Sequence, residues 1–148
     1  MNFDVKVYQT DRACVAAGLT DGGWCFGTLA GLPPGAAIDV VFDLGSDWRS
    51  YGALSLAFVI PAPNVAGLSG VVVYAVNGLM PTSSPWAVSR ARWGVAARGA
   101  GTVANGATLV GTLQRPGMGR YVIVCCTNAD GSNAVGATGS ITLTANPA

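Results

Sequence analysis

Two adjacent cysteines, Cys125 and Cys126, are the first side chains in this sequence that could do chemistry. They lie in the apolar run GRYVIVCCTNADG, which covers residues 119–131. Successive side chains of a strand point to opposite faces, so these thiols cannot ligate one metal ion together unless the strand bulges. Because the sequence has no CxxC pair, we interpret both as small buried apolar side chains. A disulfide between Cys14 and Cys25 remains open.

The sequence lacks the residues that most other catalytic mechanisms need. There is no His and no Glu, which excludes Ser-His-Asp and Cys-His arrangements and imidazole metal sites. Asp39 and Asp43 share one face of an expected strand about 13–14 Å apart, farther than the roughly 5–9.5 Å between glycosidase carboxylates. The oxygen-rich segment 128–133 lacks the pattern of a calcium loop and is interpreted as an Asp-Gly hairpin turn. We predict a non-enzymatic protein without catalytic residues, metal or cofactor.

Turn signals recur roughly every ten residues and separate segments of strand length. This spacing predicts an all-β fold, an antiparallel β-sandwich or jelly roll with about six or seven strands. We expect a single domain over residues 1–148, with an irregular N-terminal arm at 1–36 and the sandwich at 37–148. Within the arm, DRACVAAG could form a short helix. The expected strands are 37–44, 53–60, 70–76, 107–113, the run that contains the two cysteines, and 139–145.

Residues 84–99 have two interpretations. Ser84 and Pro85 could begin a helix that ends at Gly99, or the segment could be extended, which its strand-like surroundings favour. Asn77-Gly78 and Asn105-Gly106 are expected turns.

The expected strands differ in how many faces they bury. In 37–44 the apolar side chains alternate with Asp39 and Asp43, which predicts a half-buried strand. Segment 53–60 is apolar on both faces and reads as a central strand. In the cysteine-containing run, Tyr121, Ile123 and Cys125 share one face, and the other face is equally apolar. A neighbouring subunit or the N-terminal segment is therefore expected to cover the second face.

Composition limits the possible partners. Of the 148 residues, 51% are hydrophobic and only 10% are charged, and the net charge is +1. A nucleic-acid-binding domain is usually strongly basic, so none is expected here. Prolines and glycines cut the uncharged stretch 50–89 into pieces too short for a membrane-spanning helix. The N-terminus resembles no signal peptide, so we expect the chain to be made, and at least at first kept, in a reducing cytoplasm.

Charge is divided along the chain. Residues 1–47 contain six Asp against Lys6 and Arg12, whereas residues 48–148 contain six Arg against Asp130. Complementary patches of this kind could dock one subunit to another. The candidate interface residues are Val122, Val124, Arg90, Arg92, Arg115, Arg120, Asp39 and Asp43.

The aromatic side chains leave a second class of function open. Many sandwiches bind sugars on a face of Trp and Tyr side chains, and here the candidate contacts are Trp48, Tyr51, Trp86 and Trp93. The alternative function is therefore that of a carbohydrate-binding β-sandwich module on a fibre or a cell surface.

The C-terminal third carries a likeness to a known group. RPGMGRYVIV at 115–124, a Thr-Asn turn, and GSITLTA at 139–145 resemble the last strands of small virion proteins of tailed bacteriophages, including capsid decoration (cement) proteins. The resemblance implies a β-sandwich or jelly roll made in the host cytoplasm that assembles as a homo-oligomer, for example a trimer, on the capsid surface. It also implies contact with the major capsid protein. The function expected is to stabilise the phage head through protein–protein contacts.

Overall fold

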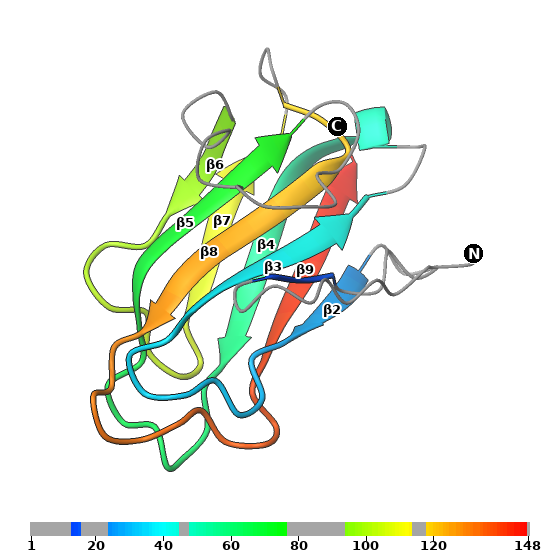
Figure 1. Cartoon of the computed structure of the whole chain (residues 1–148). Coiled ribbons are helices and arrows are strands. Elements are labelled where there is room, and N and C mark those ends of the chain that lie inside the picture. Colours follow the sequence, from blue (N-terminus) through cyan, green and yellow to red (C-terminus); the bar gives the residue numbers. More distant parts are fainter. Residues whose placement is uncertain (1–12, 16–23, 45–47, 77–93, 114–117, 148) are drawn as a thin grey trace.

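A computed structural model describes residues 13–15, 24–44, 48–76, 94–113 and 118–147. Their strands form two β-sheets that pack face to face (Figure 1). The predicted antiparallel β-sandwich is confirmed. Within these ranges, no helix is long and apolar enough to span a membrane.

Sheet A has five strands in the described part of the chain. Across the sheet they follow the order β1 (Ala13–Val15), β3 (Ala37–Asp43), β8 (Tyr121–Asn128), β5 (Leu68–Val76) and β6 (Gly94–Arg98). Strand β1 runs parallel to β3, and the other neighbours are antiparallel.

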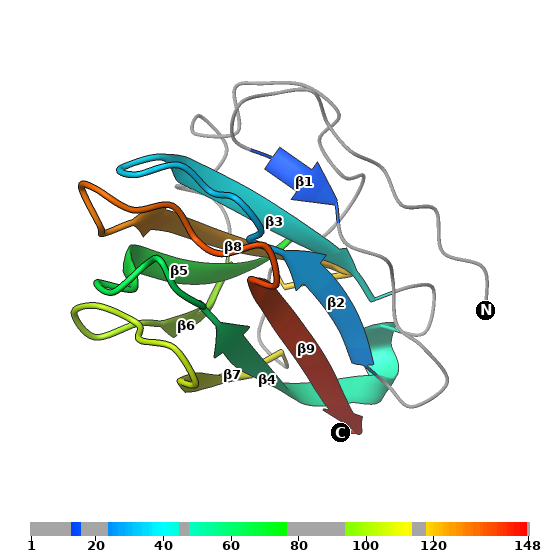
Figure 2. The same ribbon diagram turned by 90° about the horizontal axis from the view of Figure 1, so that it is seen from below.

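Sheet B has four described strands, all antiparallel to their neighbours. Their order is β2 (Trp24–Thr28), β9 (Ser140–Pro147), β4 (Tyr51–Val59) and β7 (Thr108–Thr112). A short 3₁₀ turn, η1 (Trp48–Ser50), leads into β4. Figure 2 shows the two sheets as separate layers, with β6 and β7 on the same side of the sandwich.

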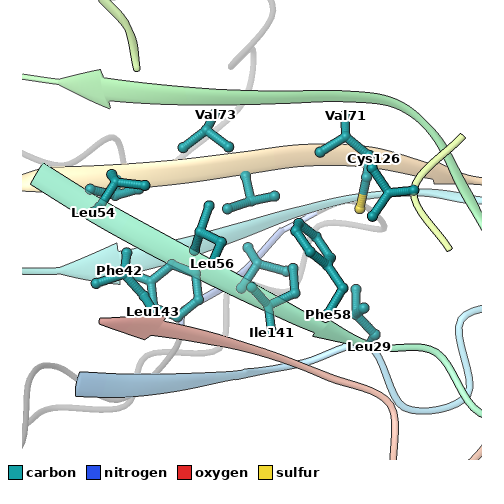
Figure 3. Close-up of a cluster of buried hydrophobic side chains, with 14 of the residues drawn as sticks. Leu29, Phe42, Leu54, Leu56, Phe58, Val71, Val73, Cys126, Ile141 and Leu143 are labelled. Atoms are coloured by element: carbon teal, nitrogen blue, oxygen red, sulfur yellow. The ribbon is translucent and has the colours of Figure 1, made fainter. Parts of the chain in front are cut away.

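Alternating side chains fill the space between the sheets. In sheet B, Leu56 and Phe58 of β4 and Leu143 of β9 point inward (Figure 3). They meet Phe42 and Val73 from sheet A in the same cluster. A strand with a period of two presents one such apolar face to the core, and burying each large side chain stabilises the fold by about 1.5–3 kcal/mol.

Most sequence-predicted strands and turns are present. Segment 53–60 corresponds to β4, which lies between β9 and β7 as a central strand. Segments 70–76, 107–113 and 139–145 correspond to β5, β7 and β9. Residues 94–98 form β6, in agreement with the extended interpretation, while the rest of 84–99 and the Asn77-Gly78 turn lie outside the described residues. The predicted Asn105-Gly106 turn is present: the Ala107 N–H donates to the carbonyl oxygen of Ala104, and Gly106 has a φ of 84°, which glycine adopts without steric cost.

The prediction of an irregular N-terminal arm was wrong in two places. Residues 13–15 form β1 rather than part of a helix, and residues 24–28 form β2. Both are short edge strands. Strand β2 pairs with β9, which lies more than 100 residues later in the chain, so no local sequence pattern predicts it.

The prediction that 37–44 is half-buried was also wrong. Asp39 is only 2% exposed, and Val41 beside it is fully buried. Strand β3 therefore buries both faces, because the outer face of sheet A is covered within the chain.

Strand β8 has the two apolar faces that its sequence predicts. Val122, Val124 and Cys126 belong to the core between the sheets. Ile123 and Cys125 join Val41 and others in a second buried group on the outer face of sheet A, which we call the outer cluster. Its buried members are Val41, Val76, Tyr121, Ile123 and Cys125. Since this cluster is buried within a single chain, β8 does not need a neighbouring subunit to cover its second face.

Candidate interaction surface

The outer face of sheet B is the open sheet face of the described structure. Alternate residues of β7, of β4 from Ala53 onward and of β9 from Thr142 onward point away from the core, and we call these residues the sheet B face. They are Ala53, Ser55, Ala57, Val59, Thr108, Val110, Thr112, Thr142, Thr144 and Asn146.

Strand register arranges this face in rows. Neighbours across β9, β4 and β7 are Thr142–Ala57–Thr108, Thr144–Ser55–Val110 and Asn146–Ala53–Thr112. Directly opposed side chains in antiparallel strands have Cβ atoms about 4.5–5.5 Å apart, so each row is continuous. The small and β-branched side chains therefore form a regular surface without large protrusions.

The sheet B face contains no charged side chain, yet it is accessible. Val110 is 74% exposed and Val59 is 41% exposed. A solvent-facing sheet surface is polar, and the centres of protein interfaces are depleted of charge. This face shares the depletion of charge with interface centres and the Thr, Ser and Asn side chains with solvated sheet faces.

The size of the face limits what it can do alone. Its three strands cover roughly 20 Å by 14 Å, or about 280 Å². A stable interface usually buries about 800 Å² on each partner. A partner must therefore also contact neighbouring strands or loops, or several weak contacts must act together.

A polar network holds the loops at one end of the sandwich. The loops between β2 and β3, β4 and β5, and β8 and β9 gather there, at the lower end of Figure 1. At their centre lies Asn128, which is 1% exposed. Its Nδ2 donates to the carbonyl oxygens of Leu32 and Asn133 at 3.1 and 3.0 Å. Its Oδ1 accepts from Nδ2 of Asn64 at 2.6 Å and from the N–H of Asp130 at 2.9 Å.

Asp130 completes this network through its carboxylate. Oδ1 accepts the backbone N–H groups of Ser132 and Asn133 at 2.9 and 3.0 Å, and Oδ2 accepts that of Val65 at 3.0 Å. The N–H donors, led by that of Ser132 and then that of Val65, lower the pKa of Asp130 to about 2. Its oxygens thus bind protein N–H groups, and the residue joins two loops.

The hairpin predicted at Asp130-Gly131 is wrong. Residues 129–139 form a loop that carries the chain from β8 in sheet A to β9 in sheet B. A tight hairpin would keep the chain in one sheet, whereas the network around Asn128 and Asp130 stabilises a longer crossing. The described residues contain no group of three or more side chains suited to hold a metal ion.

The structure does not bring the predicted interface residues together. Val122 and Val124 are fully buried between the sheets, so they are core side chains and present no surface to a neighbouring subunit. Asp39 is buried on the other face of sheet A. Arg90, Arg92 and Arg115 lie outside the described residues.

Asp43 and Arg120 form an ion pair within the chain. Nε and Nη2 of Arg120 donate to the two carboxylate oxygens of Asp43 at 2.6 and 2.9 Å. This hydrogen bonding raises the pKa of the Arg120 guanidinium. The pair joins the acidic first part of the chain to the basic second part. Because it is partly exposed, we expect it to contribute no more than about 1 kcal/mol.

The candidate aromatic contacts are not displayed as a platform. Trp48 and Tyr51 are half-buried and pack against the core. The guanidinium of Arg49 lies over the Trp48 ring, 4.3 Å from its centroid, and occupies one face of that ring. Trp86 and Trp93 lie outside the described residues.

Cys14 and Cys25 lie on β1 and β2, which belong to opposite sheets. A disulfide between them stays a prediction.

Sequence reasoning missed the sheet B face. The signal was present in the alternation of residues 108–112 and 140–146, where Thr and Val replace the charged residues expected on a solvent face. What no pattern in the sequence shows is that β4 lies between these two strands, which makes one surface of three segments distant along the chain.

Neither protein-family models nor curated protein sequences match this chain. The resemblance to phage virion proteins therefore stays a prediction.

Proposed function

We propose that this chain is a non-enzymatic virion subunit of a tailed bacteriophage, a decoration (cement) protein that binds the major capsid protein through the sheet B face. The observation that supports this most directly is an exposed sheet face of ten outward residues without a single charge. Depletion of charge is one of the compositional features of an interface centre.

The energetics favour a repeated partner. Burial of about 280 Å² on each of the two partners, at roughly 25 cal/mol per Å², supplies at most about 14 kcal/mol, and less where the buried atoms are polar. Association costs about 4–15 kcal/mol in lost freedom of motion, so one such contact is weak. A capsid presents the same site many times. An oligomeric subunit that engages two or more copies gains avidity without any new kind of contact.

Binding to purified phage heads tests this function. Heads are prepared from the organism that encodes the chain, stripped of the subunit, and mixed with Thr144→Arg, which puts a charge in the middle of the sheet B face. We expect at least a tenfold loss of binding, because the arginine must be desolvated at the interface. The matched control is Thr102→Arg, an exposed threonine in the loop between β6 and β7. Absence of the chain from the heads, or equal binding by both variants, would contradict the proposal.

A further inference from the structure

Among the described residues, strand β7 is the last strand of sheet B, and its second edge has no strand partner there. In the order of the sheet, β7 pairs with β4 on one side only. The residues just before and just after β7 show which backbone groups point to β4. The N–H of Phe58 donates to the carbonyl oxygen of Ala107, and the N–H of Leu113 donates to the carbonyl oxygen of Gly52. Because this direction alternates along a strand, the N–H and C=O groups of Thr108, Val110 and Thr112 point to the free edge.

This edge lacks the usual protection against pairing. Natural edge strands carry charges, prolines or bulges that block the approach of another strand. Strand β7 (TLVGT) has neither charge nor proline, and its register with β4 is unbroken. The edge strand β6 of sheet A differs, since it carries Arg98 and its pairing with β5 shifts register between Val73 and Tyr74.

The neighbouring strand β6 does not occupy this edge. It approaches β7 from the core side, at Gly111, where an added Cβ would lie 2.5 Å from the carbonyl oxygen of Ala96. The side chains of Thr108, Val110 and Thr112 point the opposite way and are exposed. The outer face of β7 is therefore accessible, and no strand of the described part of the chain pairs with its outer edge.

The exposed residues of β7 are complementary to themselves. They read Thr, Val, Thr, a pattern that is the same in both directions. A two-fold axis through Val110 would pair Thr108 with Thr112 of the second copy and Val110 with its own equivalent. No like charges would face each other, and such pairs of β-branched residues are favourable. A self-complementary patch is what a two-fold interface requires.

We propose that two copies of this chain associate by antiparallel pairing of their β7 strands about a two-fold axis at Val110. The backbone N–H and C=O groups of Thr108, Val110 and Thr112 in the two copies would together form about six hydrogen bonds. Sheet B then continues across the axis, and two sheet B faces lie side by side. Together they offer roughly 560 Å², much closer to a standard interface than one face alone. The proposed function requires an oligomeric subunit, and the β7 pairing would supply it as a dimer. The role of this dimer on the capsid therefore rests on the proposed function.

Disulfide cross-linking tests the pairing without phage heads, so the two proposals can fail separately. In the dimer the Val110 Cα atoms lie about 5.5 Å apart, within disulfide range, whereas the two Thr108 Cα atoms lie about 14 Å apart. Val110→Cys should therefore give a dimer linked through residue 110, identified by mass spectrometry. Thr108→Cys in the same exposed strand, and Val65→Cys at an 84% exposed loop position, should cross-link at least tenfold more slowly.

The mass in solution gives the second readout. By analytical ultracentrifugation at micromolar concentration, the wild type should have the mass of two chains. Val110→Lys puts two ammonium groups at the axis and should raise the dimer dissociation constant at least tenfold. Its fold should survive, because Val110 is 74% exposed, and circular dichroism checks this. A monomeric or trimeric wild type, or cross-linking of Thr108→Cys as fast as Val110→Cys, would overturn the proposal.

Discussion

At the scale of single residues, the polar side chains at the loop end act through hydrogen bonds that they make inside the protein. The Asn128 side chain both donates and accepts hydrogen bonds. It satisfies backbone carbonyl and N–H groups of two loops, where no strand partner is available. Leaving such groups buried and unsatisfied costs about 1–3 kcal/mol each. Asp130 contributes in the same way, but its contribution depends on its charge.

We predict that the stability of the protein depends on pH through Asp130. Its pKa in the folded state is about 2, against an ordinary value of 3.8. A depressed pKa means that the carboxylate stabilises the fold above about pH 4, and that this contribution is lost as pH falls towards 2. Chemical denaturation of wild type and Asp130→Asn should therefore differ at pH 6 and converge as pH approaches 2.

Ser132→Ala is the control for this experiment. It keeps the backbone N–H that donates to Asp130 and should retain the wild-type pH dependence. A difference between wild type and Asp130→Asn that stays constant from pH 6 to pH 2 would contradict the assignment.

At the scale of elements, the two sheets converge on the side of β6 and β7. Gly111 is the point of contact, because its hydrogen leaves room for the backbone of Ala96. In an ordinary sandwich two sheets lie about 10 Å apart, so a side chain at this position would separate the strands.

Gly111→Ala should destabilise the fold by about 1–3 kcal/mol, since the new methyl group meets backbone and not a flexible side chain. Gly131→Ala is the matched control, because a Cβ there meets nothing within 4 Å, and we expect a change within about 0.5 kcal/mol. Urea unfolding followed by tryptophan fluorescence measures both. Equal stability of the two variants would show that β6 and β7 are not in backbone contact.

At the scale of the whole molecule, the two sheets differ in how they treat their outer faces. In sheet A, the central strand β8 buries both faces, with Val122 in the core and Ile123 in the outer cluster. Sheet B buries one face and leaves an uncharged surface open. In the proposed function, this asymmetry would direct assembly to sheet B.

The two adjacent cysteines report on this asymmetry. Cys126 faces the core and Cys125 the outer cluster, and both are buried within one chain. Neither thiol should therefore react with N-ethylmaleimide when an assembly dissociates under mild conditions, and both should react in denaturant. Peptide mass spectrometry separates them from Cys14 and Cys25. Labelling of Cys125 on dissociation alone would mean that a neighbouring subunit covers the outer cluster.

Local patterns in the sequence were sufficient to predict the β-sandwich and to predict which side chains share each face of β8. Alternation in 139–145 and the change of face between Cys125 and Cys126 follow from the period of two of a strand, which needs only neighbouring residues. The edge strands β1 and β2 could not be found in this way, because each is defined by a partner far along the chain.

The sequence by itself determined the class of fold and the absence of histidine and glutamate chemistry, because composition and short-range periodicity are local properties. Only the tertiary structure decided which apolar and polar residues are accessible. It buried Val122, Val124 and Asp39 and paired Asp43 with Arg120 within the chain. It also assembled the open sheet B face from three separate segments. Exposure depends on which strands become neighbours, and that is set by packing between residues distant in sequence.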